Sequence, residues 1–330
     1  MIQYSVVVPA YQSERVLPHC LAALLRQSID QTQYEIIVVD DGSTDRSAEV
    51  AEQMLRQTAA RVIRATHHGP AQARNLGAQA AQARLILFTD ADCAPAPDWI
   101  AQMASAFDDP SISGAKGAYR THQRSLVARF VQQEYQDKYD RLLAQPAIDF
   151  VDTYAAAYRR EIFLASGGFD PVFTTSSVED QELSFRLARQ GHRLVFVPDA
   201  IVYHQHNASW RGYLRRKFGI GYWKVLLLAR HPEKAVRDSH TPQIVKVQII
   251  LLAFALPVTG SAVFWPIGLK IAIGLWLLLF LTMLPLLVKI MQRDPAVLPI
   301  APILIMLRAF GLGLGLLAGF IHFDLFRQSM

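Results

Sequence analysis

Cysteine is scarce in this chain, which has only Cys20 and Cys93 among its 330 residues. Small secreted domains that depend on disulfides carry more cysteines at close spacings, so this composition excludes a disulfide framework of that kind. A reducing compartment such as the cytoplasm fits it. Residues 1–4 run directly into the apolar segment 5–8, with no basic region and no small-residue cleavage site. We therefore expect no secretory signal peptide in this sequence.

Charged residues are common up to about residue 240 and rare in residues 244–322. The apolar fraction of 52% is high for a wholly soluble protein, and its local excess predicts a soluble head on a membrane anchor. The net charge is +5, yet the head has no run of basic residues interleaved with aromatics. We therefore expect no nucleic-acid partner and assign the positive charge to anionic lipid.

Three apolar stretches near the C-terminus, at about 244–265, 267–290 and 299–322, are each long enough to cross a membrane. About 20 residues at 1.5 Å per residue span the hydrocarbon core of a bilayer. Basic residues flank the first two stretches, which predicts a multi-pass protein of the inner (plasma) membrane with a cytoplasmic head and an outward-facing tail. These basic residues are Lys234, Arg237, Lys246, Lys289 and Arg293.

The third stretch contains a glycine at every fourth position, Gly311, Gly315 and Gly319. Such a stripe of small residues lets another helix approach closely. Contact with the hairpin of the first two stretches is the first interpretation, and homo-oligomerisation is the second. Arg308 lies in the same stretch, either as a counterion to a polyprenyl phosphate or as a side chain that reaches the cytoplasmic face.

Short aliphatic runs alternate with helical stretches in the first half of the chain. The runs are typical of strands that a sheet buries on both faces, and the stretches are long enough for crossover helices. This rhythm predicts an α/β fold with a doubly wound, mostly parallel sheet, which binds ligands at the carboxyl ends of its strands. The runs are 6–8, 36–39, 62–63 and 85–88, and the stretches are 16–25, 45–56 and 71–83.

Two acidic residues, Asp90 and Asp92, directly follow the buried run 85–88. Carboxylate oxygens are the ligands that Mg²⁺ and Mn²⁺ prefer, and these ions keep open positions for phosphate. The pair is therefore a candidate site for a divalent cation that holds a diphosphate. An ordinary turn or helix cap is the alternative.

Polar loops also follow the first two strands. Tyr11 is suited to stacking on a planar base, and Asp41 to accepting a hydrogen bond from a base edge or a ribose hydroxyl. The alternatives are a half-buried loop aromatic and a helix-capping turn. Arg74 lies about one turn into a helix that begins near Pro70, where it either meets a diphosphate or is solvated at the surface.

Glu179 and Asp180 lie at the start of a predicted helix that runs to Gln190. Acidic residues there complement the helix dipole, which is the structural interpretation. The functional interpretation is a general base, because a sugar hydroxyl is a poor nucleophile until a carboxylate accepts its proton.

Over about residues 4–205, these motifs resemble family 2 glycosyltransferases of the GT-A type. The matching places are Val7 to Tyr11, Val39 to Ser43, Ala73 to Gly77 with Asp90-x-Asp92 behind it, and Glu179-Asp180. The resemblance implies a nucleotide-diphosphate-sugar donor, a divalent metal (Mn²⁺ or Mg²⁺) at Asp90 and Asp92, and Asp180 as catalytic base. It implies donor binding by Pro9, Tyr11, Glu14, Asp40, Asp41, Arg74 and Asp90. We assign Gly168, Glu179, Arg215, Arg216 and Lys217 to the acceptor side.

Basic and aromatic residues alternate at helical spacing in residues 210–224, which predicts a helix in the membrane interface rather than an ordinary packed helix. Processive polysaccharide synthases of the same family carry a Gln-x-x-Arg-Trp motif around this point, and the sequence has none here. Addition of one sugar per encounter is therefore favoured. The segment is similar to membrane-anchored family members that build exopolysaccharide repeat units on a lipid carrier.

The sequence thus predicts a catalytic domain at 1–207, an amphipathic interfacial segment at 208–243 and a membrane domain at 244–330. The expected reaction is an inverting, metal-dependent sugar transfer, with a UDP-sugar as donor by resemblance. The expected acceptor is a polyprenyl carrier or a lipid-linked glycan in cell-envelope or exopolysaccharide synthesis. The alternative is a catalytically inactive membrane scaffold that binds nucleotide sugars. A nucleotidyltransferase is disfavoured, because the loop at 9–12 is not glycine-rich and basic.

Overall fold

The computed structural model describes residues 2–56, 58–175, 177–236, 241–262 and 266–327. Its internal contacts divide the chain into two compact units. The first unit comprises residues 1–122 and 139–205, and the second comprises 123–138 and 206–330. Residue 1, Arg237 and the end of the first apolar stretch at 263–265 lie outside the described residues.

The first unit is built on one mixed sheet of eight strands in the order β3-β2-β1-β4-β7-β6-β8-β5. The pairs from β3 to β4 are parallel, as is the pair β6–β8, whereas β7 runs antiparallel to both of its neighbours and β5 runs antiparallel to β8. The strands are β1 (Tyr4–Ala10), β2 (Tyr34–Asp40), β3 (Ala60–Arg64), β4 (Leu85–Phe88), β5 (Cys93–Pro95), β6 (Ile112–Arg120), β7 (Ala156–Arg159) and β8 (Arg193–His204).

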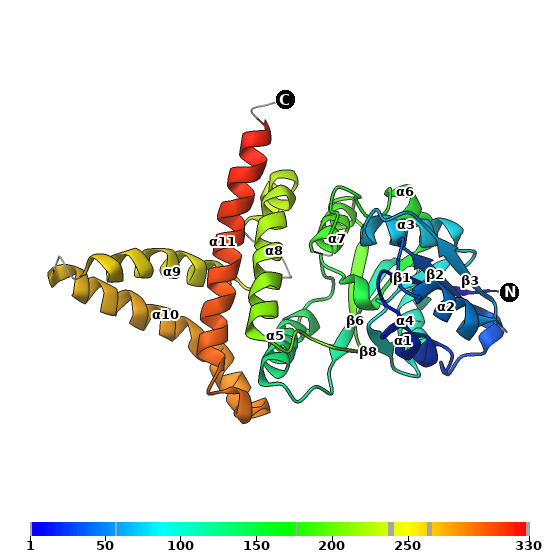
Figure 1. Cartoon of the computed structure of the whole chain (residues 1–330), viewed down its shortest axis with the longest axis horizontal. Coiled ribbons are helices and arrows are strands. Elements are labelled where there is room, and N and C mark those ends of the chain that lie inside the picture. The colour runs from blue at the N-terminus through cyan, green and yellow to red at the C-terminus, as the bar shows by residue number, and fades with distance from the viewer. Residues whose placement is uncertain (1, 57, 176, 237–240, 263–265, 328–330) are drawn as a thin grey trace. The chain divides into compact units, whose positions relative to one another are not determined.

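Helices connect and cover these strands (Figure 1). They are α1 (Leu17–Leu24), α2 (Ser47–Leu55), α3 (Pro70–Ala80), α4 (Trp99–Ser105), α6 (Arg160–Ala165) and α7 (Glu179–Arg189), with short 3-10 turns at η1 (Gln31–Gln33), η2 (Ala106–Asp108) and η3 (Thr153–Ala155). Every residue of β2 is buried, as expected for a central strand covered on both faces. The predicted α/β architecture with crossover helices is therefore confirmed.

Helix α3 lies very close to the sheet at Gly77. A Cβ atom added there would overlap Val7 Cγ1 of β1 and lie 3.2 Å from Val39 Cγ2 of β2. This close approach brings the first turn of α3, with Arg74, to the carboxyl ends of the central strands. Glycine is needed at this position because any side chain would push the helix away from the strands.

We expect Gly77→Ala to lower the free energy of unfolding by about 1–3 kcal/mol, the usual effect of overpacking a well-packed core. Denaturant or thermal unfolding of the full chain in detergent measures this change. The matched control is Gly219→Ala in a helix of the second unit, where no described atom lies within 4 Å of an added Cβ. The control should be neutral or stabilising by up to about 1 kcal/mol. Equal losses in both variants would contradict the packing argument.

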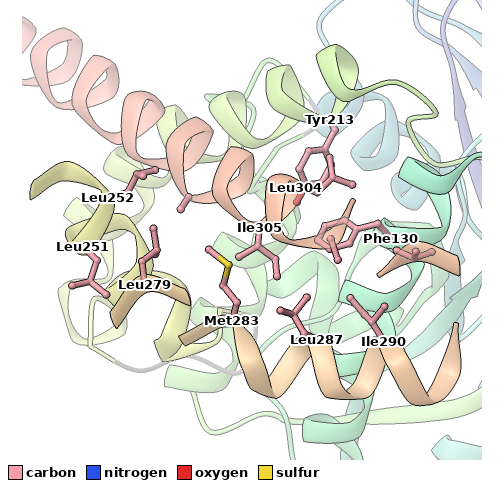
Figure 2. Close-up of a cluster of buried hydrophobic side chains, with 13 residues drawn as sticks. Phe130, Tyr213, Leu251, Leu252, Leu279, Met283, Leu287, Ile290, Leu304 and Ile305 are labelled. Atoms are coloured by element: carbon pink, nitrogen blue, oxygen red, sulfur yellow. The ribbon is translucent and has the colours of Figure 1, made fainter. Parts of the chain in front are cut away.

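The second unit contains the first part of α5 (Leu126–Leu143) together with the C-terminal helices. These helices are α8 (Trp210–Arg230), α9 (Gln243–Ser261), α10 (Pro266–Arg293) and α11 (Ala301–Arg327), with 3-10 turns at η4 (Pro232–Lys234) and η5 (Pro295–Val297). An apolar cluster joins Phe130 of α5 and Tyr213 of α8 to α9, α10 and α11 (Figure 2). The predicted domain boundaries at 207 and 243 place residues 123–138 in the catalytic domain, whereas the internal contacts group these residues with the second unit. The boundaries stay a prediction.

Three helices of the second unit are long and apolar enough to cross a membrane. They are Gln243–Ser261, Ile267–Arg293 and Ala301–Phe323. The finding supports membrane association through the predicted stretches. The inner membrane, the cytoplasmic head and the outward-facing tail stay predictions at this point.

The glycine stripe of α11 packs against α8. Added Cβ atoms at Gly315 and Gly319 would overlap the backbone carbonyls of Phe218 and Tyr222, and one at Gly311 would lie 3.2 Å from the carbonyl of Leu214. The expected contact of this stripe with the hairpin is therefore wrong. Homo-oligomerisation through the stripe is likewise not supported, because the backbone of α8 already occupies that face.

Arg308 does not reach the surface. Its side chain is buried, and it donates to Glu134 of α5 and to Gln248 of α9, each at 2.9 Å. Glu134 also forms an ion pair with Lys217 at 3.0 Å. Burial alone raises the pKa of the Glu134 carboxyl, but the charges of Lys217 and Arg308 outweigh burial and hold that pKa below its ordinary value. The snorkelling interpretation of Arg308 is therefore wrong, and its observed partner is an internal carboxylate.

Candidate active site

Arg74 connects three segments that are distant in the sequence. Its guanidinium donates to Asp90 Oδ1 at 2.6 Å, just beyond the end of β4, and to Glu179 Oε1 at 3.1 Å, in the first turn of α7. The Arg74 side chain is fully enclosed, and the side chain of Glu179 is only 1% exposed. Surface solvation, the alternative considered for Arg74, is therefore excluded. The ion cluster fixes the start of α7 at the edge of the sheet.

The charge of Arg74 is maintained by its acidic neighbours. Burial lowers the pKa of the guanidinium, but Asp90, Glu179 and Asp180 together raise it above its ordinary value. The Nε atom of Arg74 is buried and has no hydrogen-bond partner among the described residues. A buried donor that is unsatisfied in this way calls for a small partner such as an ordered water molecule, because the enclosed side chain presents almost no surface to a larger group.

Asp180 lies on the same side of the first unit as this cluster. Its charge acts on Arg74, on Lys116 of β6 and on Tyr158 of β7. One of its carboxylate oxygens accepts a hydrogen bond from the amide of Gln181 at 2.8 Å. The structure therefore brings Asp90, Glu179 and Asp180 together around Arg74. The roles predicted for these residues stay predictions.

Lys116 is a buried cation that the sequence did not single out. Its ammonium group donates to the hydroxyl of Tyr154 at 2.9 Å, forms an ion pair with Asp152, and lies 5.6 Å from the ring centre of Phe150. Burial lowers the pKa of Lys116 well below its ordinary value, and the charge of Asp180 opposes this shift. A single lysine within a glycine- and alanine-rich strand gives no local signal of such a position.

Asp92 forms a pair with His204 at the end of β8. His204 Nε2 lies 3.1 Å from Asp92 Oδ2, and the ligand atoms of Asp92, Cys93 and His204 all lie within 4.8 Å of one another. The antiparallel register of β5 and β8 causes this, because it places Cys93 opposite His204. Three groups at this spacing are able to hold a metal ion. No local pattern in the sequence marks His204, which lies 112 residues from Asp92.

The three groups differ in their suitability as ligands. Burial, together with the charges of Asp92 and Asp90, raises the pKa of the Cys93 thiol well above its ordinary value, so the sulfur keeps its proton. Burial raises the pKa of Asp92, but the hydrogen bond and charge of His204 outweigh it, and the net pKa is lowered. A carboxylate and an imidazole fit Mn²⁺ or Mg²⁺ better than a protonated thiol does. The donor set thus fits a hard divalent cation through Asp92 and His204.

Tyr11 and Asp41 both contact the loop that precedes α3. The ring of Tyr11 is 46% exposed and stacks on His67, with 4.1 Å between ring centres. The buried carboxylate of Asp41 accepts from the amides of His68 at 3.0 Å and Gly69 at 2.9 Å, and lies 2.9 Å from His67 Nδ1. Asp41 therefore holds the loop that leads into α3, while Tyr11 and His67 offer an exposed aromatic surface. Base contacts by Tyr11 and Asp41 stay a prediction.

The other donor-side candidates lie at the same edge of the sheet. Pro9 is in β1, opposite Val39 of β2. Glu14 accepts from the amide of Arg46 at 3.2 Å, directly before α2. Asp40, the last residue of β2, is buried, and its Oδ1 atom has no partner among the described residues. A buried acceptor of this kind requires water or a ligand for its satisfaction.

Two acceptor-side candidates, Gly168 and Glu179, have contacts within the first unit. Gly168 adopts a positive φ of 67°, and its carbonyl accepts from Arg186 at 2.7 Å. Asn75 of α3 clamps the adjacent Phe169 backbone with bonds of 2.7 and 2.9 Å, so this turn is fixed against α3. The carboxylate of Glu179, besides contacting Arg74, accepts from the amide of Ser177 at 2.7 Å.

The other acceptor-side candidates, Arg215, Arg216 and Lys217, lie in α8 of the second unit. Arg215 and Arg216 are exposed, whereas Lys217 is paired with Glu134. Their contribution to acceptor binding stays a prediction.

The site as a whole combines acidic groups, an enclosed arginine and an exposed aromatic pair along the carboxyl ends of β1, β2 and β4. The histidine at the end of β8 completes a possible metal-ligand pair. Such an arrangement is suited to binding an aromatic base and a diphosphate, and to removing a proton from a nucleophile.

Most of the first unit matches a known protein family. Residues 5–166 match the model of the family described as glycosyl transferase family 2. The pre-mycofactocin glycosyltransferase of Mycobacterium tuberculosis is 30% identical over 206 residues, which cover 60% of this chain and 43% of that protein. Chondroitin synthase of Escherichia coli is 28% identical over 236 residues, covering 61% of this chain and 34% of that protein. This chain thus spans less than half the length of these curated relatives.

Solved structures share the fold at low sequence identity. The mannosyltransferase PcManGT from Pyrobaculum calidifontis, in complex with GDP-Man and Mn²⁺, has a TM-score of 0.59 at 20% identity, covering 97% of this chain and 86% of that one. Residues 1–349 of TarS from Staphylococcus aureus give a TM-score of 0.51 at 16% identity, covering 100% and 92%. The fold of the first unit is therefore of the GT-A type, and residues 5–166 form a domain of glycosyl transferase family 2.

Proposed function

We propose that this protein transfers a sugar from a nucleotide-diphosphate sugar to a membrane-associated acceptor. The observation that carries the proposal is the cluster in which Arg74 binds Asp90 and Glu179 beside Asp180. Family membership supports the reaction class, and the apolar helices of the second unit support a membrane-associated acceptor. A polyprenyl phosphate and a lipid-linked glycan are the two acceptor classes, and a UDP-sugar is the first donor to test.

The donor's nucleoside lies, in this proposal, against Tyr11 and His67, whose stacked rings present a surface for a planar base. The buried Asp40 carboxylate, with its unpartnered oxygen, accepts a hydrogen bond from the base or ribose. The diphosphate extends toward Asp90 and Arg74. TarS has also been solved with UDP-GlcNAc, with a TM-score of 0.51 to this chain, and PcManGT with GDP-Man, which supports the same class of donor.

Asp92 and His204 are the residues that would hold a divalent cation, with Asp90 beside them. When bound, such an ion neutralises negative charge on the diphosphate as it leaves. The mixed oxygen and nitrogen donor set fits Mn²⁺ or Mg²⁺, and PcManGT was solved with Mn²⁺. The enclosed guanidinium of Arg74 adds a fixed positive charge on the same side.

Asp180 acts as the general base in the proposed reaction. It accepts the proton of the acceptor hydroxyl as the acceptor oxygen attacks the anomeric carbon from the side opposite the diphosphate. A single displacement of this kind inverts the anomeric configuration. Glu179, which Arg74 and the Ser177 amide hold in place, orients the helix start that carries Asp180.

A transfer assay tests the proposal against the alternative of an inactive scaffold. The purified chain in detergent is incubated with labelled sugar nucleotides, Mn²⁺ or Mg²⁺, and lipid extract from the native host. We expect label from one donor to move into the organic phase. Donor binding with no transfer to any lipid fraction would instead support the nucleotide-sugar-binding scaffold.

We expect His204→Ala and Asp92→Asn each to weaken Mn²⁺ binding at least about tenfold, because each removes one of few protein ligands. Electron paramagnetic resonance of Mn²⁺, titrated with protein in the presence of the preferred nucleoside diphosphate, measures this affinity. The control is His19→Ala, which removes an exposed histidine of α1. Unchanged Mn²⁺ affinity in both site variants would contradict this metal site.

A further inference from the structure

Helices α8 and α11 run side by side and in the same direction. Each of the three stripe glycines of α11 meets α8 at a position four residues further along than the one before: Gly311 meets Leu214, Gly315 meets Phe218 and Gly319 meets Tyr222. Two helices that advance together in this way lie at the same level along their length. Whatever depth in the membrane α11 occupies, α8 therefore occupies too.

Helix α8 is unsuited to the hydrocarbon core of a bilayer. It carries basic residues along its whole length, and the exposed Arg215 and Arg216 lie level with the segment Gly311–Gly315. That segment is the middle of the apolar part of α11, Ala301–Phe323. If α11 crossed the membrane, these two arginines would lie near the bilayer centre, where charged side chains are strongly unfavourable. The basic residues of α8 are Arg211, Arg215, Arg216, Lys217, Lys224 and Arg230.

Helix α11 also crosses the α9–α10 hairpin instead of running along it (Figure 1). Arg308 bonds Gln248 of α9, and Gly313, five residues further along α11, packs against the neighbouring Ile249. If α11 ran along α9, Arg308 and Gly313 would contact residues of α9 that are about five positions apart. The apolar cluster in Figure 2 accordingly contains only the first part of α11, including Leu304 and Ile305.

The first part of α11 lies beside polar groups of α5. Arg308 pairs with Glu134 of α5. Two further ion pairs link α5 to the C-terminal end of α10, where the hairpin ends. These pairs are Arg129 with Asp294 and Lys289 with Asp137, the latter at 2.7 Å. Ion pairs at the end of a hairpin mark the level where it leaves the hydrocarbon. Because Arg308 pairs with the same helix, α5, the first part of α11 lies at that level too.

The side of α11 turned away from the glycine stripe is apolar and exposed. Its residues recur at spacings of seven, four, three and four, which puts them on one side of a helix. Helix α11 has no charged face of its own, since Arg308 is its only ionised residue between Ala301 and Phe323, and the basic residues lie on its partner α8. It is therefore the packed pair that presents an apolar side and a basic side, as interfacial helices do on an anionic membrane. The residues of this face are Ile303, Phe310, Leu314, Leu317 and Ile321, between 38% and 58% exposed.

We propose that only the α9–α10 hairpin crosses the membrane, and that α8 and α11 lie together in its interface. The apolar face of α11 enters the acyl boundary, and the exposed basic residues of α8 meet anionic lipid headgroups. These exposed residues are Arg211, Arg215, Arg216 and Arg230. The C-terminus is then on the same side as the head, contrary to the outward-facing tail expected from three spans. This placement rests on the apolar hairpin and not on the proposed transfer reaction, so either can fail alone.

Depth measurements with single introduced cysteines distinguish the two placements. Both native cysteines are buried, so they give little background labelling. A fluorophore at Ile303→Cys, Leu314→Cys or Ile321→Cys is quenched by nitroxide lipids of known depth, in vesicles of phosphatidylcholine and phosphatidylglycerol. We expect one shallow depth for all three positions. The control, Leu278→Cys in the middle of α10, should be quenched best by deep nitroxides.

A spanning α11 gives a different depth profile. Ile303 and Ile321 are separated by 18 residues, or about 27 Å along a helix, so labels there would lie near opposite membrane surfaces with Leu314 deep between them. A graded profile of this kind would overturn the proposal.

Labelling of the two membrane sides provides an independent test on the full chain. A cysteine appended after Met330 and one at Gly260→Cys, near the hairpin tip, are treated with a membrane-impermeant maleimide in sealed vesicles of each orientation. We expect the appended cysteine to react on the same side as an N-terminal reporter, and Gly260→Cys to react on the other. Reaction of the appended cysteine together with Gly260→Cys would contradict the proposal.

Discussion

Replacement of Asp180 by asparagine should lower the rate of sugar transfer by about 10²- to 10⁴-fold and leave donor affinity unchanged. Loss of a positioned general base has an effect of this size, because the acceptor oxygen must then attack with its proton still in place. Asparagine keeps the shape of the side chain, so the ion cluster of Arg74 with Asp90 and Glu179 remains intact. Initial rates with labelled donor and lipid extract, together with calorimetric titration of donor, measure both quantities.

The matched control for this variant is Asp199→Asn, which neutralises an exposed aspartate of β8. Its transfer rate should equal that of the unmodified protein. If Asp180→Asn also retained normal turnover, Asp180 would have no part in proton removal. If it lost donor binding as well as turnover, its role would be in the architecture of the site.

Replacement of Arg74 by methionine should lower the free energy of unfolding by about 3–5 kcal/mol, the usual effect of removing one partner from a buried ion cluster. Glu179 would be left buried without its cation, and Asp90, which is 25% exposed, would lose its contact at 2.6 Å. Arg74→Lys should recover only part of this loss, because one ammonium nitrogen replaces the two guanidinium nitrogens that contact Glu179 and Asp90 separately. Unfolding of the full chain in detergent measures the change.

A double variant separates the ion cluster from general packing effects. Arg74→Met combined with Glu179→Gln removes the uncompensated buried charge, so it should be more stable than Arg74→Met alone. The control, Arg189→Met at the exposed end of α7, should change stability by less than about 0.5 kcal/mol. Additive losses in the double variant would contradict the inferred coupling.

The central strands and their loops were predictable from local pattern. The runs at 6–8, 36–39 and 85–88 are the cores of β1, β2 and β4, because a buried parallel strand needs an uninterrupted aliphatic sequence. The shorter run 62–63 lies in β3, the half-buried strand at the edge of the sheet. The polar residues that follow such strands must lie at one edge of the sheet. The positions of Tyr11, Asp41 and Asp90 at that edge follow from this rule.

The second half of the sheet was not predictable in the same way. Strand β6 reads Ile-Ser-Gly-Ala-Lys-Gly-Ala-Tyr-Arg, with no aliphatic run to mark it. The approach of His204 to Asp92 depends on the pairing of β5 with β8, which is a long-range contact. The contact of Arg74 with Glu179 of α7 likewise joins residues that are far apart in the sequence, so no local pattern predicts it. Residues whose roles come from distant pairing carry no local signal.

The membrane helices show the limit of composition as a guide. Length and hydropathy identified the apolar stretches at about the observed bounds, including α10 and α11. They could not show that α11 packs along α8, because the glycine stripe specifies a close neighbour without naming it. The basic residues of that neighbour, and not the hydropathy of α11 itself, are the basis for placing α11 in the interface.

The most direct test of the proposed active site is an experimental structure of the full chain with Mn²⁺ and the nucleoside diphosphate that it binds most tightly. We predict the base beside Tyr11 and His67, the metal on Asp92 and His204, and the diphosphate at this metal on the side of the Arg74–Asp90 pair. A nucleotide bound elsewhere on the first unit, with Asp180 turned away from the distal phosphate, would contradict the account.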